Sequence, residues 1–290
     1  MPAPPPWPPV PPIEMPPART LRIADRGELF MRDTGGGGPV VLLLHGWLAS
    51  ADLNWLGAYG ALTEAGYRVL AIDHRGHGRG IRSLAPFRLA DCAGDAAAAL
   101  RTLEAAPAIV VGYSMGGAIA QLIARDHPDV LAGLVLSGTA QHWKDREAQR
   151  MFRQMAAFGL VLSLAPEATW RWGFRRVGLR PSAQTVWVQS ELMRHSSRDV
   201  AEAGRELGRF DSRPWLRPPA VPTAVVLTSR DQAVAPRKQR ELAAAVRARV
   251  FEASIDHLQI ITRARHYTPA LLDAMAAVRD AGGVGIEQRA

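Results

Sequence analysis

The chain contains little cysteine, little lysine and no long apolar run. Its only cysteine among 290 residues is Cys92, so no intrachain disulfide can form and no cysteine-based metal site is expected. No stretch approaches the ~20 apolar residues that a membrane-spanning helix needs, and the uncharged run of residues 154–166 is too short. Residues 1–17 are dominated by proline and lack the basic and apolar regions of a secretory signal. We therefore expect a cytoplasmic protein with no stable membrane insertion.

Positive charge is present, but arginine carries almost all of it. The formal net charge is +8, and the only lysines are Lys144 and Lys238. No run of basic residues is interleaved with aromatic residues, and no nucleic-acid-binding motif occurs. The sequence therefore predicts no nucleic-acid partner. A hydrophobic share of 48% and a charged share of 21% are typical of a globular protein.

Five segments form apolar runs and a sixth, the last, is weaker, a pattern typical of strands that helices cover on both faces. They are residues 39–44, 68–73, 108–111, 134–137, 223–227 and 248–252. Helical patterns lie between them, over residues 86–104, 115–127, 236–247 and 268–281. A hairpin of residues 20–24 and 29–32 is expected before them. This alternation predicts an α/β fold with a doubly wound, mostly parallel sheet.

The alternation stops between residues 141 and 217. This stretch has a helical pattern, five of the eight tryptophans, and fourteen Lys or Arg residues against eight Asp or Glu residues. We expect residues 140–217 to form a mainly helical cap, inserted into a core of residues 19–139 and 218–290. Residues 1–18 are expected to form a disordered, proline-rich arm.

The segment Gly112-Tyr113-Ser114-Met115-Gly116 places the pattern G-x-S-x-G between an apolar strand and an alanine-rich helical start. A serine on a sharp strand-to-helix turn needs small residues two positions before and after it, and Gly112 and Gly116 meet this need. The turn exposes the hydroxyl and points helix N–H groups at whatever it attacks. The pattern therefore predicts Ser114 as a nucleophile.

A serine nucleophile needs a base, and the base needs an acid that orients it. Asp231 and His257 each follow an apolar run, so both are expected at carboxyl ends of strands, where α/β sheets build their sites. We assign Asp231 as the acid and His257 as the base. His266 is the rival base, but it adjoins the helix that we expect to start at residue 268.

Two backbone N–H groups are needed to hold the oxyanion that forms during acyl transfer. Met115, directly after the nucleophile, would supply one, and Trp47, after the first long apolar run, would supply the other. His45 is assigned a structural role in bracing that loop. In the glycine-rich residues 73–80, we expect Asp and Arg to form a loop-locking ion pair. No metal site is expected there, because no carboxylate or cysteine falls at ligand spacing from the histidines.

These motifs together resemble the α/β-hydrolase fold superfamily, in its serine-nucleophile branch, over residues 20–139 and 220–282. The resemblance rests on His45-Gly46-Trp47, Asp73-x-Arg75-Gly76-His77-Gly78, Gly112-Tyr113-Ser114-Met115-Gly116-Gly117, Asp231 and His257. In that family these correspond to the oxyanion loop, a structural turn, the nucleophile elbow, the acid and the base. The family usually has glycine before the base, whereas this chain has Asp256.

The resemblance implies a serine hydrolase that forms an acyl-enzyme from carboxylic esters, including lipid esters or lactones. The chain is similar to the esterase, lactonase and cofactor-free haloperoxidase-like branches, whereas epoxide hydrolases and haloalkane dehalogenases use aspartate at the elbow. The same triad also serves perhydrolysis, amide or C–C hydrolysis and acyl transfer, and the sequence does not separate these. A weakly catalytic ligand-binding protein on the same scaffold is the alternative from another class. No cofactor is expected, and the expected partner is a small ester-type substrate.

Overall fold

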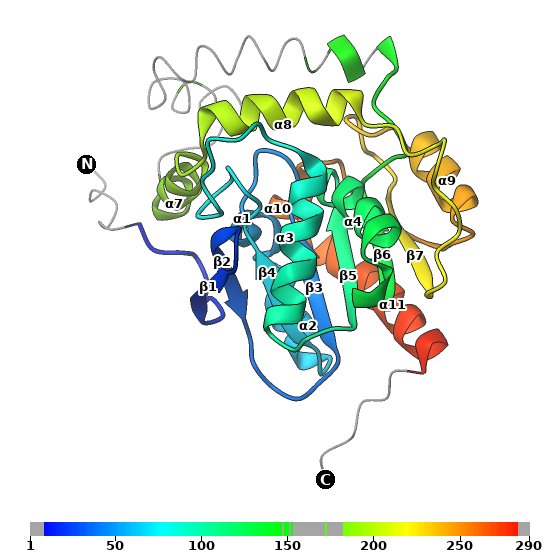
Figure 1. The fold of residues 1–290 in the computed structure, drawn as a ribbon, viewed down its shortest axis with the longest axis horizontal. Helices are drawn as coiled ribbons and strands as arrows, with labels where there is room; N and C mark the ends of the chain where they lie inside the picture. Colours follow the sequence, from blue (N-terminus) through cyan, green and yellow to red (C-terminus); the bar gives the residue numbers. More distant parts are fainter. Residues whose placement is uncertain (1–8, 147, 151, 153–171, 173–181, 284–290) are drawn as a thin grey trace.

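An eight-stranded sheet lies at the centre of the molecule (Figure 1). The computed structural model describes residues 9–146, 148–150, 152, 172 and 182–283. The strands follow the order β1-β2-β4-β3-β5-β6-β7-β8. Their bounds are β1 (Ala18–Ile23), β2 (Gly27–Asp33), β3 (Val40–Leu44), β4 (Arg68–Ile72), β5 (Ala108–Tyr113), β6 (Leu131–Ser137), β7 (Thr223–Thr228) and β8 (Arg249–Ala253).

Most of the sheet is parallel. The hairpin of β1 and β2 is antiparallel and joins the edge of β4 in the antiparallel sense, whereas all neighbours from β4 to β8 run parallel. The six apolar runs of the sequence are these six parallel strands, and β5 is buried at every residue because both faces of the sheet are covered. The predicted doubly wound α/β architecture is confirmed.

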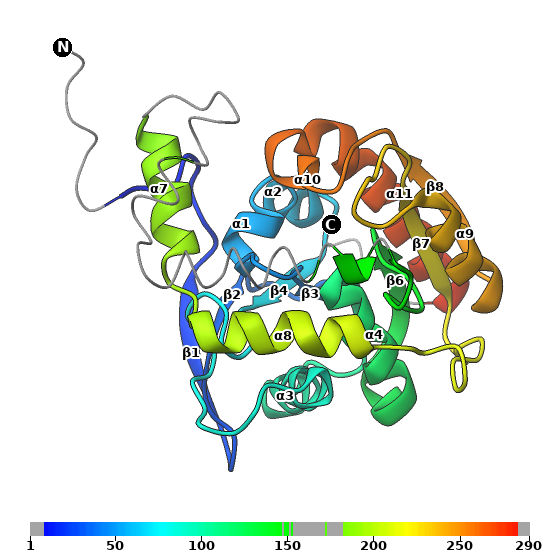
Figure 2. The same ribbon diagram turned by 90° about the horizontal axis from the view of Figure 1, so that it is seen from above.

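Helices cover the two faces of the sheet in separate layers (Figure 2). One hydrophobic cluster joins the sheet to α3 (Leu89–Thr102), α4 (Met115–Asp126) and α9 (Pro236–Ala245). A second cluster joins it to α1 (Ala51–Trp55), α2 (Tyr59–Glu64), α10 (Gln259–Thr262) and α11 (Ala264–Gly282). Alternate residues of β3 divide between the clusters, because successive side chains of a strand point to opposite faces. A short turn of 3₁₀ helix, η1 (Pro128–Val130), precedes β6.

Among the described residues between β6 and β7 in the sequence, two further helices have defined bounds. They are α7 (Ala183–Leu192) and α8 (Ser197–Arg209), and the side chains of Ser182 and Ser196 cap their first turns. Both fall within the range expected for the inserted cap. Figure 1 shows α8 lying across the end of α3. Of the five tryptophans in this range, Trp143 and Trp187 are buried, and Trp170 lies outside the described residues.

The helix expected over residues 268–281 begins earlier than predicted. It is α11, which starts at Ala264 and contains Pro269 in its second turn. Proline removes one helical hydrogen bond, but its fixed φ is compatible with a helix. A proline in an early turn of a helix therefore does not have to be the first helical residue. None of the helices in the described part of the chain combines the length and apolar character that a membrane crossing requires.

Candidate active site

Ser114 lies on the tight connection between β5 and α4. Its backbone has φ 53° and ψ −114°, a conformation that costs energy for a residue with a side chain. The turn leaves no room for larger neighbours. A Cβ on Gly112 would lie 2.3 Å from the carbonyl oxygen of Gly116, and one on Gly116 would lie 2.2 Å from that of Leu44. The two glycines therefore allow α4 to pack directly against the ends of β5 and β3.

His257 meets Ser114 from the loop after β8. Its Nε2 lies 2.9 Å from the Ser114 hydroxyl oxygen, and its Nδ1 lies 2.7 Å from Oδ2 of Asp231. A carboxylate only accepts hydrogen bonds, so Nδ1 donates to Asp231 and Nε2 is left to accept from the serine. Ser114 is 7% exposed, and the side chain of His257 is 14% exposed. The structure thus brings together the three residues that the sequence assigned as nucleophile, base and acid.

Asp231 is held in place by several donors from its own loop after β7. Its Oδ1 accepts from the backbone N–H groups of Ala233 and Val234, at 2.9 and 2.7 Å. Its Oδ2 accepts from the Thr228 hydroxyl at 2.7 Å as well as from His257. Both carboxylate oxygens are therefore fixed by partners other than the histidine, and the buried carboxylate holds the imidazole in one tautomer.

Tyr113 supports the histidine in a way that the sequence analysis missed. Its hydroxyl donates to the carbonyl oxygen of His257 at 2.6 Å, and the two rings lie 5.2 Å apart. Burial raises the pKa of Tyr113 well above its ordinary value, so the hydroxyl keeps its proton. The residue sits inside the G-x-S-x-G pattern, but that pattern leaves its position open. Only the fold reveals a contact between residues 144 positions apart.

The rival base His266 lies elsewhere. It is exposed in the first turn of α11, where its Nε2 lies 3.3 Å from Nε of the neighbouring Arg265. Among the described residues, the partner of the Ser114 hydroxyl is His257. The geometry therefore favours His257 over His266.

The loop after β3 borders the serine. This segment, which we call the β3–α1 loop (residues 45–50), contains both Gly46 and Trp47. A Cβ on Gly46 would lie 3.3 Å from Cβ of Ser114, and the Gly46 N–H donates to Oδ1 of the buried Asn54 at 3.0 Å. Leu48 has φ 61°, a left-handed conformation that bends the loop. No acceptor within the described part of the chain pairs with the backbone N–H of Trp47 or Met115, the two expected oxyanion donors.

His45 braces this loop from beneath. Its Nδ1 donates to the carbonyl oxygen of Gly46 at 2.8 Å, and its Nε2 accepts from the backbone N–H of His74 at 2.9 Å. Complete burial lowers the pKa of His45 well below its ordinary value, which keeps the ring neutral. The contacts fit the structural role expected for this residue.

The glycine-rich segment of residues 73–80 forms several ion pairs, within itself and with neighbouring elements. Asp73 accepts from the backbone N–H of Arg79 at 2.8 Å and lies 3.5 Å from its guanidinium, whereas Arg75 pairs with Asp95 at 2.7 Å. Burial raises the pKa of Asp73 to about 6. Within the described ranges, no group of three or more His, Cys, Asp or Glu side chains is arranged to hold a metal ion.

Comparison with known proteins gives sequence matches over part of the chain and a structural match over most of it. Epoxide hydrolase B of Mycobacterium tuberculosis is 42% identical over 100 residues, 34% of this chain and 28% of that protein. A non-heme haloperoxidase of Rhodococcus erythropolis is 37% identical over 116 residues, 40% of this chain and 42% of that protein. The chain thus spans less than half the length of these curated relatives.

A solved esterase from Exiguobacterium antarcticum superposes with a TM-score of 0.75 at 20% identity, over 88% of this chain and 97% of that one. At this identity the likeness concerns the fold alone. The family model of the alpha/beta hydrolase fold matches residues 39–263, which include the loops that carry Trp47, Ser114, Asp231 and His257. The chain therefore belongs to the α/β hydrolase fold family.

Proposed function

We propose that this protein is a serine hydrolase of carboxylic esters, with Ser114 as nucleophile, His257 as general base and acid, and Asp231 as the residue that orients the base. The observation that supports it best is the continuous chain of two hydrogen bonds from Ser114 Oγ through His257 to Asp231, at 2.9 and 2.7 Å. A hydroxyl beside a neutral imidazole whose other nitrogen is held by a carboxylate is arranged for proton removal.

The reaction runs in two halves on the same imidazole. Ser114 Oγ attacks the acyl carbon while His257 Nε2 takes its proton, and the protonated ring then gives that proton to the departing alkoxide as the C–O bond breaks. Water next attacks the acyl-enzyme while Nε2 takes one of its protons. The ring returns this proton to Ser114 Oγ, and the carboxylic acid leaves.

Stabilisation of the oxyanion falls to the backbone N–H groups of Met115 and Trp47. Met115 is the first residue of α4, so its N–H also carries the positive end of the helix dipole. Donors of this kind act on charge that develops only in the transition state, and each one typically contributes about 10²–10³-fold in turnover.

The names of the relatives span several reactions, and the residue at the elbow supports an ester over an epoxide as substrate. Epoxide hydrolase B is a relative by sequence, but Ser114 stands at the elbow, where the family resemblance implies aspartate for epoxide hydrolases. A serine supports an acyl-enzyme, which is the intermediate of ester hydrolysis. We therefore place the esters ahead of the epoxides. We also propose that α7 and α8, as part of a cap over residues 140–217, border the path by which a small-molecule substrate reaches Ser114.

A fluorophosphonate probe tests the assignment directly. The Ser114 oxygen attacks phosphorus and expels fluoride, so we expect stoichiometric labelling of the wild-type protein at the peptide that contains Ser114. The Ser114→Ala variant should lose both the label and about 10⁵–10⁶-fold of its ester turnover. The matched control is Thr102→Ala, which removes an exposed hydroxyl at the end of α3. Undiminished labelling of Ser114→Ala, in a protein that still unfolds cooperatively, would refute the proposal.

A further inference from the structure

We propose that α8 holds the β3–α1 loop in its working position through the side chain of Trp47, so that this helix contributes to transition-state stabilisation. The proposal rests on the function inferred above, because it gives the Trp47 backbone N–H its task. Trp47 would then have two roles: its side chain positions the loop, and its backbone N–H donates to the oxyanion.

The first observation is a hydrogen bond between distant parts of the chain. The Trp47 indole N–H donates to the backbone carbonyl oxygen of Val200 at 2.8 Å, across 153 positions of sequence. Val200 lies within α8. A buried or half-buried indole N–H usually finds a partner, and this partner is backbone, whose position follows the helix and does not depend on a rotamer.

The second observation is the fit of the ring against the same helix. A Cβ on Gly204, one turn after Val200, would lie 2.6 Å from Cζ2 and 3.0 Å from Cη2 of Trp47. Glycine is unfavourable inside a helix by roughly 0.5–1 kcal/mol relative to alanine. Its place on the buried side of α8 is therefore explained by the close approach of the tryptophan ring. Phe152 closes the other side, with its ring centre 5.6 Å from that of Trp47.

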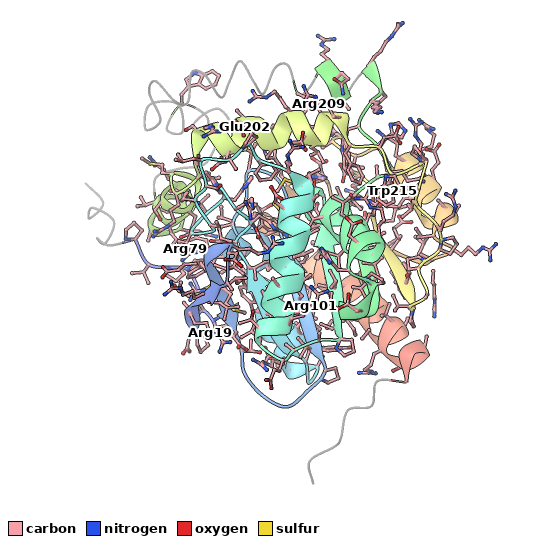
Figure 3. The ribbon with its side chains drawn as sticks, in the orientation of Figure 1. Arg19, Arg79, Arg101, Glu202, Arg209 and Trp215 are labelled. Atoms are coloured by element: carbon pink, nitrogen blue, oxygen red, sulfur yellow. The ribbon has the colours of Figure 1, made fainter. Side chains whose placement is uncertain are left out.

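The residues just before α8 are hydrogen-bonded to the glycine-rich segment of residues 73–80. The Ser196 N–H donates to the Gly76 carbonyl oxygen at 2.9 Å, and Nδ1 of His195 accepts from the Gly78 N–H at 2.8 Å. Further along, Glu202, labelled on α8 in Figure 3, accepts from the Phe87 N–H at 2.7 Å. Because α8 is itself hydrogen-bonded to the core, the bond from Trp47 to α8 links the β3–α1 loop to the core as well.

Held on one side by α8, the β3–α1 loop is held on the other by Asn54 of α1, through the Gly46 N–H. Directly after Trp47, the backbone bends through the left-handed conformation of Leu48. A loop under such strain keeps its shape only while its surroundings impose it. Release of the indole would let the Trp47 N–H move away from the oxyanion, and a donor displaced from its line loses much of its effect.

The competing account is that the Trp47 ring only fills space between the loop and α8. Under that account, loss of the indole N–H changes thermal stability but has no particular effect on the transition state. Two variants separate the accounts. Trp47→Phe keeps an aromatic ring and removes the donor, and Gly204→Ala leaves the loop sequence intact and displaces the ring from the helix side.

Two substitutions of the same kinds serve as controls. Trp215→Phe makes the same chemical change at a half-buried tryptophan beside Phe210, and Gly60→Ala adds a methyl group in α2, where no atom lies within 4 Å of the new carbon. Figure 3 labels Trp215, which lies on the opposite side of the molecule from α7.

The experiment compares kcat and KM for p-nitrophenyl acetate with the inhibition constant of a trifluoromethyl ketone. Ser114 adds to that ketone and generates an oxyanion, so its affinity reports on the transition-state contacts. We expect both test variants to lower kcat by about 10-fold, less than the 10²–10³-fold for complete loss of a donor. The affinity for the ketone should weaken in parallel with kcat/KM, KM should change little, and both controls should resemble the wild type.

Unchanged kcat and unchanged ketone affinity in Trp47→Phe and Gly204→Ala, in proteins that the fluorophosphonate still labels at Ser114, would overturn this inference and leave the proposed function standing. Absence of both turnover and labelling in the wild type would overturn the proposed function and this inference together. If Trp47→Phe fails to fold, Gly204→Ala decides the question, because its loop is unaltered.

Discussion

Ser114, His257 and Asp231 come from three loops that the sequence separates widely, and each is held in place by its own neighbours as well as by the other two. The elbow glycines fix the serine, the Ala233 and Val234 N–H groups fix the aspartate, and Tyr113 holds the backbone of the histidine. Such preorganisation matters because displacements of about 1 Å in catalytic groups can cost about 10²-fold in rate.

The two histidines near the end of the chain provide a residue-scale prediction. His257→Ala should lower kcat for an ester by about 10⁴–10⁶-fold, because it removes the only imidazole that contacts Ser114 in the described part of the chain. His266→Ala should leave kcat unchanged, because that side chain is exposed on α11. Steady-state kinetics of both variants measures this. Loss of activity at position 266 with retention at position 257 would reverse the assignment.

Much of the site could be predicted from residue patterns, because Ser114, Asp231 and His257 each follow a predicted strand within a few residues. The supporting residues could not. Nothing in the local sequence of Asn54 or Thr228 distinguishes it from any other polar residue at a helix or strand end. Their roles arise from contacts with Gly46 and with Asp231, which depend on how the loops fold back.

At the scale of elements, the parallel strands β3 to β7 were predictable because burial on both faces leaves continuous apolar runs, whereas the edge strand β8 is mostly exposed and gave a weaker pattern. The short helices α1 and α2 were not predicted, since five or six residues hold too little periodicity to stand out. The start of α11 was wrong because Pro269 was treated as a boundary, although the helix continues through it. For α7 and α8, the sequence indicated helices but not where they rest, which depends on side chains such as Glu191.

Glu191 joins α7 to the core through buried charge. Its Oε2 accepts from Ser50 and from Arg79, both at 2.9 Å, and Arg79 also binds Asp52 at 2.7 Å. Figure 3 labels Arg79 on the side of the molecule near α7. The carboxylate is 3% exposed, so its partners would lack a substitute acceptor if it were removed.

We expect Glu191→Gln to lower the free energy of unfolding by about 1–3 kcal/mol, because an amide has one acceptor where the carboxylate has two and leaves buried donors unpaired. Glu206→Gln is the matched control. Glu206 lies 4.0 Å from the largely exposed Arg209, and exposed pairs contribute about 0–1 kcal/mol. Urea unfolding measures both changes, and equal effects of the two substitutions would contradict a special role for the buried pair.

For the whole molecule, a cluster of buried histidines links stability to pH. His45, His74 and His77 are almost fully buried, and the His77 ring lies 5.5 Å from both His45 and His195. Burial is the main cause that lowers all four pKa values, to about 3 for His74 and to about 4 for His195. Arg82 contributes a further lowering at His195, and Asp73 is the acidic group of the same loop.

The direction of the pH effect follows from which state binds more protons. In the unfolded chain these histidines take up protons near pH 6.5, whereas in the folded protein they stay neutral to lower pH. Their contribution to stability is therefore present above pH 6.5 and is lost as the pH falls below it. Asp73 acts in the opposite sense between about pH 4 and 6, because its pKa is raised to about 6 in the folded state. Four histidines outweigh one aspartate.

We therefore expect the free energy of unfolding to change little between pH 7.5 and pH 6.5 and to decrease from there to pH 5, by up to about 1.4 kcal/mol per pH unit for each histidine that titrates only on unfolding. Urea titrations at several pH values measure this slope. His195→Asn keeps a side-chain acceptor for the Gly78 N–H and removes one titrating group, so it should give a shallower slope. His266→Ala, at an exposed position, should keep the wild-type slope. A free energy of unfolding that stays constant or rises as the pH falls from 7.5 to 5 would contradict the lowered pKa values of the buried histidines.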